Sequence, residues 1–177
     1  MRSLFFMLCL VSCCSSANAQ KTLGSGNAII KFVSTRNSDV QAVNSKVNVT
    51  INEAGEISFK LLIRDFKFAM EQMEEHFNKE YMESDKYPQA SFKGKIQGLN
   101  KIDFTKAGLY KVNVAGELSI HNVTKKVVVS GTLQVERTAV NIKAKFIIDI
   151  DDHKIDTGLG GIIIGNKMSV DVAAKCQ

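Results

Sequence analysis

One stretch of the sequence decides the fold: residues 66–94, FKFAMEQMEEHFNKEYMESDKYPQASFKG. Its first half carries large apolar residues at positions i, i+3, i+7 and i+11, namely Met70, Met73, Phe77 and Tyr81. Residues at these spacings lie on one face of an α-helix. The spacing therefore predicts a helical segment over residues 70–81.

The second half of this stretch changes to the alternation of a β-strand. From Ala90 to Gln97, apolar or small residues alternate with serine, lysine and glutamine, so the two kinds would point to opposite faces. Pro88, the only proline in the chain, lies at the join. Proline has no N–H for a β-ladder and favours an extended residue before it. We expect the helix to end before Tyr87 and a strand to follow.

The same alternation recurs through the rest of the chain and predicts an all-β protein with a single helical interruption between the third and fourth strands. The strands are expected at residues 27–35, 42–52, 56–68, 90–98, 108–121, 123–136, 138–151 and 166–175. Eight antiparallel strands in one small domain indicate a sandwich or an up-and-down barrel. Several strands are about 13 residues long against a usual 5–6, which favours a tall, coiled barrel over a flat sandwich.

Two turns fix the expected register of the later strands. A two-residue turn at His121–Asn122 would pair Ile120 with Val123 and continue to Tyr110 opposite Leu133. A second two-residue turn at residues 136–137 would place Leu133 opposite Val140. Both hairpins keep the apolar faces together, and a slip of one residue would scramble them.

The inward side of these strands contains small residues where a barrel core usually has large ones: Gly94, Gly116, Gly131 and Ala144. Glycines in strands can relieve strain at bends in a filled barrel, or they can leave space for a ligand. Eight-stranded barrels occur in both forms. From the sequence, a filled barrel and a hollow one remain equal alternatives.

The first residues have the order of a secretory signal peptide: Arg2, an apolar run, then small residues ending at Ala19. We therefore expect a signal peptide at residues 1–19 and one exported domain at residues 20–177, in the periplasm or secreted. The apolar run is shorter than the ~20 residues that span a bilayer. An alternative is a lipoprotein anchored through Cys13, because Leu10–Cys13 resembles a lipoprotein cleavage site.

Cysteine content and charge exclude several classes of protein. Three of the four cysteines lie in the predicted leader, so no disulfide framework is expected. Cys176 is expected to be a frayed thiol near the C-terminus. The formal net charge of +5 comes from lysines spread along the strands, whereas nucleic-acid binding needs a concentrated basic face with aromatics. We expect no nucleic-acid partner.

No catalytic or metal-binding constellation is predicted. The acidic run from Asp149 to Asp156 lacks the glycine and glutamate of a calcium-binding loop, and a polar turn is expected there. Asp156–Gly158 is a chance match to an aspartic-protease motif, which needs a second aspartate from another lobe or subunit. The three histidines have no nucleophile near them in sequence. We expect no cofactor, and the glycines after Asp156 to form a flexible connection.

Lys125 is unusual because the predicted register gives its side chain the inward phase, two residues from a turn. A buried lysine needs an anionic partner or a route to water. Either its side chain reaches solvent at the barrel rim, or it meets a phosphate or another anionic group at the barrel mouth.

Three segments resemble the signature of the YceI-like family: His76–Phe77, Tyr87–Pro88-x-Ala90-x-Phe92, and residues 116–125, GELSIHNVTK. Members of this family are small exported β-barrels that resemble lipocalins in shape and hold polyisoprenoid lipids, so the resemblance implies an eight-stranded, lipocalin-like barrel. Two departures are the asparagine at position 122, where the family usually has glycine, and residues 153–156, where relatives carry an aromatic residue and a proline. The resemblance implies a binding protein without covalent chemistry.

The candidate ligand contacts come from the helical stripe and from the inward phase of the strands. They are Phe32, Phe59, Phe66, Phe68, Met70, Met73, Phe77, Tyr81, Phe92, Tyr110, Leu133, Phe146 and, for a polar head, Lys125. Aromatic rings and flexible thioethers suit a long, irregular hydrocarbon. The alternative for the helical stripe is an ordinary plug that fills one barrel end.

The leading hypothesis is a protein that stores or transports a polyisoprenoid or other long-chain lipid. The alternative is a non-enzymatic envelope stress or interaction protein with a filled barrel, and an uncharacterised hydrolase comes third. The sequence leaves open whether the protein forms a homodimer.

Overall fold

Residues 22–177 are described by the structure, a computed structural model of the chain. The predicted signal peptide, its cleavage site and Cys13 lie outside the described residues. The eight long strands are β1 (Thr22–Ser34), β2 (Gln41–Asn52), β3 (Glu56–Leu62), β5 (Gln89–Ile96), β6 (Gly108–Ile120), β7 (Val123–Val135), β8 (Val140–Asp149) and β9 (Lys167–Cys176).

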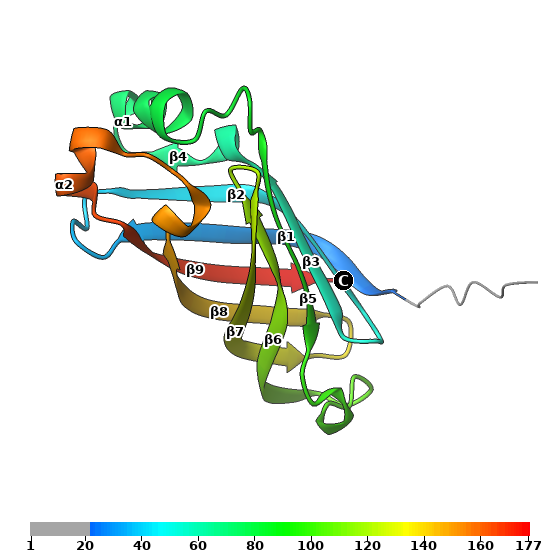
Figure 1. The fold of residues 1–177 in the computed structure, drawn as a ribbon. Helices are drawn as coiled ribbons and strands as arrows, with labels where there is room; N and C mark the ends of the chain where they lie inside the picture. The colour runs from blue at the N-terminus through cyan, green and yellow to red at the C-terminus, as the bar shows by residue number, and fades with distance from the viewer. Residues whose placement is uncertain (1–21) are drawn as a thin grey trace, which may run out of the picture.

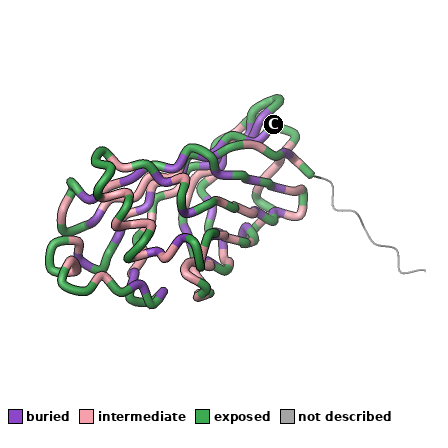
Figure 2. The backbone as a smooth tube through the Cα atoms, turned by 90° about the horizontal axis from the view of Figure 1, so that it is seen from above, coloured by how far each residue is buried: buried purple, intermediate pink, exposed green. Residues whose placement is uncertain are grey.

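The strands form one antiparallel sheet that closes on itself, as predicted (Figure 1). Its order is β1-β9-β8-β7-β6-β5-β3-β2, and pairing of β1 with β2 closes the barrel. Buried and exposed residues alternate along the strands (Figure 2), because successive side chains point to opposite sides. The fold is therefore an all-β barrel with a lipocalin-like arrangement.

The predicted third strand, 56–68, is broken in the structure. β3 ends at Leu62, a 3₁₀ turn η1 (Ile63–Asp65) follows, and the two-residue β4 (Lys67–Phe68) then pairs with β2 instead of continuing the β3–β5 ladder. The ladder ends here because the Ile63 N–H donates to the Pro88 carbonyl at 2.9 Å, whereas Pro88 has no N–H to return the bond. The Ile63 side chain is buried in the turn that follows. The break carries the chain across one end of the barrel.

The helical segment is confirmed at its expected place. α1 (Glu71–His76) begins directly after Met70 and continues into a π-helical turn, η2 (Phe77–Tyr81). Both lie between β4 and β5 at one end of the barrel (Figure 1). Within residues 22–177, none of the helices combines the length and hydrophobicity needed to span a bilayer.

The hairpin between β6 and β7 has the predicted register. Ile120 pairs with Val123 and Tyr110 with Leu133. His121 and Asn122 form the turn, both with positive φ. On the outer face of this hairpin, the hydroxyl oxygens of Ser119 and Thr124 lie 2.7 Å apart.

The hairpin between β7 and β8 differs from the prediction. A two-residue turn at 136–137 would place Leu133 opposite Val140, whereas the structure pairs Leu133 with Ile142 and closes the ladder with Val135 opposite Val140. The strands are joined by residues 136–139. The shift is two residues, so each side chain keeps its predicted side of the sheet, and only the register was wrong.

Smaller elements complete the connections. η3 (Leu99–Lys101) precedes β6, and η4 (Asp151–His153), η5 (Gly158–Gly160) and α2 (Gly161–Ile164) lie between β8 and β9. The connection predicted as flexible thus contains helical turns. The prediction for Cys176 was wrong: its thiol is buried and the residue pairs with Gly26 and Val140. Burial raises the pKa of this thiol.

Candidate functional site

The interior of the barrel has two halves with different packing. The half near η3 is filled by a cluster of buried side chains that includes Val47, Ile51, Leu133, Val135 and Cys176. The half under α1 and η2 contains a cavity of about 290 Å³. We call these the filled half and the hollow half.

Two ladders that stop short explain why one half is hollow. Within the described chain, β7 and β8 pair only between Gly131–Val135 and Val140–Ala144, and β2 and β3 only between Asn48–Ile51 and Ile57–Lys60. Paired strands lie about 4.8 Å apart. Where pairing stops, the strands can separate and the barrel widens, so facing side chains no longer fill the space between the walls.

Glycines mark the boundary between the halves. A Cβ atom added to Gly94 would lie 2.6 Å from the Phe92 ring, and one added to Gly116 would lie 2.8 Å from it. The ring of Phe92 therefore lies against both glycines, which pair with each other across β5 and β6. These small residues do not themselves create the cavity, because an aromatic ring occupies the space that they leave. Ala144, in contrast, lines the cavity.

The cavity wall is almost wholly apolar. Among residues 22–177, the only lining residues with polar side-chain groups are His76, Tyr81, Ser91 and Thr157, and none that lines the cavity is Asp, Glu, Lys or Arg. A charged group inside would lose its hydration without gaining a partner. The site therefore suits a hydrocarbon and excludes a buried ionic head.

An aromatic cluster forms the part of the wall nearest the helical segment. Phe32 of β1 lies 5.2 Å from Phe66 and 5.6 Å from Phe77, measured between ring centroids. Phe68 lies 5.0 Å from Phe77. Such distances are typical of favourable aromatic pairs. Strand β1 and the segment from η1 to η2 thus meet across the end of the barrel.

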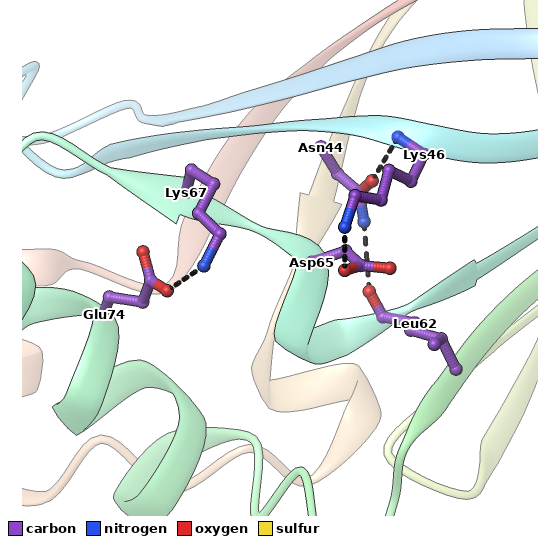
Figure 3. Close-up of polar contacts among 6 residues, drawn as sticks. All are labelled: Asn44, Lys46, Leu62, Asp65, Lys67 and Glu74. Atoms are coloured by element: carbon purple, nitrogen blue, oxygen red, sulfur yellow. Dashed lines mark hydrogen bonds and ion pairs between the residues drawn. The ribbon is translucent and has the colours of Figure 1, made fainter.

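Polar contacts hold this segment in place from outside (Figure 3). The side chain of Asn44 is fully buried; it donates to the Leu62 carbonyl at 3.0 Å and accepts from the Lys46 N–H at 2.9 Å. The Lys46 ammonium pairs with Asp65 at 3.2 Å. Asn44 thereby connects β2 to the end of β3, beyond the last pair of their ladder.

Further polar contacts connect this segment to α1. Lys67 forms an ion pair with Glu74, and the Phe68 N–H donates to the other carboxylate oxygen of Glu74 at 3.3 Å. These contacts connect β4 with α1 (Figure 3) and keep Phe66 and Phe68 over the barrel end.

The cavity reaches the surface between η2 and the loop before β9. His76 lines the cavity while nearly half of its side chain is exposed, and Thr157 and Ile164 line it from the opposite side. An added Cβ at Gly160 would lie 2.8 Å from the Tyr81 hydroxyl, so the loop packs closely against η2 at this point, and the exposed part of the cavity wall is at His76. We call this opening the mouth.

Most of the predicted contact residues line the cavity: Phe32, Phe59, Phe66, Phe68, Met73, Phe77, Tyr81, Phe92 and Phe146. Whether they contact a ligand stays a prediction. For the other four residues the structure corrects the expected position. Met70 precedes α1 and is 58% exposed, and Tyr110 and Leu133 belong to the filled half.

Lys125 is the fourth of these residues. It pairs with Leu118 as predicted, but its ammonium lies 3.5 Å from the Asp152 carboxylate and the side chain does not line the cavity. Next to it, the buried His153 ring lies 3.2 Å, through Nδ1, from the Val123 carbonyl. These contacts join η4 to β7 where the β7–β8 ladder is absent. The acidic run is thus a polar turn, as expected.

Sequence reasoning missed lining residues of two kinds. Ile30, Leu61, Val129, Ile148 and Val170 lie in strands, and alternation could have identified them. Ile155, Thr157 and Ile164 belong to the connection between β8 and β9, and no periodicity pointed to them. Within residues 22–177, no three His, Cys, Asp or Glu residues come together as a potential metal site.

A closed antiparallel β-barrel with an apolar internal cavity defines the class of the protein. The YceI-like domain profile matches residues 18–176, and the chain therefore belongs to the YceI-like family. No curated protein matched the chain in a sequence comparison.

Solved structures with the same fold are similar over most of the chain. A polyisoprenoid binding domain from Saccharophagus degradans, implicated in plant cell wall breakdown, has a TM-score of 0.75 at 15% identity, covering 87% of this chain and 98% of its own. BcnA of Burkholderia cenocepacia has a TM-score of 0.70 at 18% identity, with coverage of 85% and 96%. The YceI protein of Campylobacter jejuni has a TM-score of 0.58 at 15% identity, with coverage of 75% and 80%.

Proposed function

We propose that this protein is an exported carrier or store for a polyisoprenoid or similarly long apolar lipid. The observation that carries the proposal is the cavity, which is enclosed by aromatic and aliphatic side chains and has no acidic, lysine or arginine side chain in its wall. The Saccharophagus domain with the same fold is a polyisoprenoid binding domain, which supports this ligand class. The proposed role involves no covalent chemistry.

The cavity volume constrains how such a ligand would sit. Its 290 Å³ lies at the small end of ligand pockets, which hold roughly 300–1,000 Å³. A long chain would need the wall to adapt. Met73 and Met82 both line the cavity, and unbranched thioether side chains rearrange easily. We expect the hydrocarbon inside and the polar head at the mouth, near His76 and Thr157.

The direct test is to identify what the protein holds. The protein is purified from a membrane-containing host without detergent, extracted with solvent, and the extract is analysed by mass spectrometry. We expect a long apolar lipid near one molecule per protein. Finding none, together with no uptake of added polyprenol or polyprenyl phosphate, would reject the proposal and favour the alternative of a non-enzymatic envelope stress or interaction protein.

A pair of variants makes this test specific to the cavity. Ala144→Leu places a larger side chain in the cavity wall, and Ala174→Leu makes the same change on the neighbouring strand within the filled half. We expect the amount of lipid extracted per folded protein molecule to fall several-fold in A144L and to stay at the parent level in A174L. Equal lipid in both variants would place the ligand elsewhere.

Export is the second part of the proposal and rests on the predicted leader. The intact mass of the protein from a secreting bacterial host distinguishes the alternatives: cleavage before Gln20 gives an unmodified chain, and lipidation gives a chain that begins at a diacylated Cys13. Retention of residues 1–19 without modification would contradict both.

A further inference from the structure

The loop that forms one side of the mouth carries an unusual set of exposed aliphatic side chains. Residues 157–165, TGLGGIIIG, contain η5 and α2, and we call them the mouth loop. Leu159 is 88% exposed, Ile162 71% and Ile163 62%. The loop has no charged residue, so these side chains form an apolar tip.

The tip is continuous with the cavity. Thr157 and Ile164, at either end of the same loop, line the cavity wall. α2 lies at the same end of the barrel as α1 (Figure 1), and Gly160 approaches the Tyr81 hydroxyl from across the mouth. A ligand entering or leaving through the mouth would therefore pass beside the apolar tip.

The backbone of the loop is already hydrogen-bonded from within the protein. The Arg36 guanidinium donates to the Ile162 carbonyl at 3.0 Å, and the Ser34 hydroxyl donates to the Ile164 carbonyl. The Gly165 N–H donates to the Gly161 carbonyl at 2.8 Å. Peptide groups that have partners of this kind can enter an apolar medium without a large desolvation cost.

We propose that the mouth loop inserts its apolar tip into the surface of a lipid bilayer, so that cargo passes between membrane and cavity without crossing water. This inference rests on the proposed function for the nature of the cargo. Aliphatic side chains beside a cationic group suit the boundary between acyl chains and head groups. Arg36, at the base of the tip, would meet the phosphates.

The chemistry of the tip favours a bilayer over a protein partner. Among Leu159, Ile162 and Ile163 there is no side-chain donor or acceptor, and the glycines between them offer no shape for specific docking. A fluid bilayer requires neither. A second copy of this chain, associating mouth to mouth, would cover the same surface and is one outcome of the test.

The chain contains no tryptophan, so a single introduced one reports its own environment. The variant Leu159→Trp is compared with the control variant Leu109→Trp. The native Leu109 is 70% exposed and lies at the start of β6, at the other end of the barrel. With vesicles of phosphatidylcholine and phosphatidylglycerol, we expect a blue-shifted emission and quenching by brominated acyl chains for L159W only. No shift for L159W, or equal shifts for both variants, would overturn the proposal.

Removing the aliphatic side chains of the tip tests whether membrane binding depends on them. The double variant Ile162→Ser/Ile163→Ser is compared with Ile29→Ser/Leu109→Ser, whose native side chains are 52% and 70% exposed. Ile29 pairs with Ala173 in β9, eight residues beyond the mouth loop, and Leu109 lies at the start of β6. We expect vesicle flotation to fall about tenfold or more in the mouth-loop variant, because two partly inserted aliphatic side chains are lost. The control variant should float like the parent.

Two further results decide whether a bilayer or a second copy of the chain covers the apolar tip, and distinguish this proposal from the proposed lipid-binding function. Unchanged flotation with loss of a dimer in light scattering would overturn the bilayer in favour of a second copy. Insertion of the tryptophan is measured on lipid-free protein. Membrane insertion can therefore be observed even if no lipid is ever extracted from the protein, and it can be absent even if lipid is extracted. The two proposals can thus fail independently.

Discussion

The filled half and the hollow half of the barrel are built from the same strands with the same alternation, yet they pack differently. In the filled half, the ladders from β6 through β7, β8 and β9 are continuous, and Leu133 and Val135 are fully enclosed. In the hollow half, two ladders end and polar contacts such as Asn44–Leu62 and His153–Val123 replace them. Continuous pairing thus goes with close packing, and interrupted pairing with space.

Truncating a core side chain should show the largest difference between the halves. Leu133→Ala removes a fully enclosed side chain from the filled half and is expected to lower the free energy of unfolding by about 2–5 kcal/mol, since a new void forms. Met73→Ala enlarges an existing cavity and should cost less, about 1 kcal/mol. Urea titration of both variants measures this. Equal losses would mean that the halves are packed alike.

Enlarging an inward-facing side chain should also destabilise the filled half more than the hollow half. Ala174→Leu in the filled half is expected to destabilise by about 1–3 kcal/mol because the core is overpacked. Ala144→Leu can extend into the cavity and should change stability by less than about 1 kcal/mol. Thermal unfolding of lipid-free protein gives the comparison. A larger loss for A144L than for A174L would contradict a hollow interior at that strand.

The hydrogen bonds of Asn44 between β2 and β3 should contribute nearly as much to the free energy of unfolding as a core side chain. Asn44→Ala leaves the Leu62 carbonyl and the Lys46 N–H without their partner, at an expected cost of about 1–3 kcal/mol. Asn48→Ala is the matched control, because Asn48 is exposed on the same strand, and it should stay within about 0.5 kcal/mol of the parent. If the two variants unfold alike, Asn44 does not secure the hollow half.

The smallest expected effect is a pH dependence in the loop that closes the filled half. Hydrogen bonds from the Thr105 hydroxyl and N–H, aided by Lys106, lower the pKa of Asp103 from 3.8 to about 2. A lowered folded-state pKa stabilises the fold above the unfolded pKa, and this contribution disappears as the pH falls from about 4 to 2.

The Thr105→Val variant tests this dependence. It removes the hydroxyl donor, so its stability should fall less than that of the parent between about pH 5 and 2.5. Urea midpoints at the two pH values provide the measurement. Because the Asp103 side chain is 43% exposed, the difference should be small, and identical pH profiles would show that Thr105 does not hold this carboxylate.

Local patterns in the sequence were sufficient for the main architecture. The stripe from Met70 to Tyr81 predicted the helical segment, and the turn at His121–Asn122 predicted the full β6–β7 register. The break at Leu62 was not predicted, although the apolar residues change phase across it, from positions 57, 59, 61 and 63 to positions 66 and 68. Residues distant in sequence determine the break: Asn44 donates to the Leu62 carbonyl, and Pro88 has no N–H to continue the ladder beyond Ile63.

The candidate site was predicted only where it follows strand phase or helical spacing. Phe32, Phe92 and Phe146 face the cavity as their phase requires. Leu133 has the same inward phase but lies in the filled half, since phase gives the side of the sheet and not the position along the barrel axis. The mouth loop could not be placed because its glycines permit many conformations.

The sequence by itself determined that this chain forms an all-β barrel, which residues face inward, and that a helical segment interrupts the strands near Pro88. Only the tertiary structure decided that one half is filled and the other hollow. The physical reason is that alternation reports direction, whereas cavity volume depends on the separation of the walls. That separation is set where the β2–β3 and β7–β8 ladders end, by contacts between residues far apart in the chain.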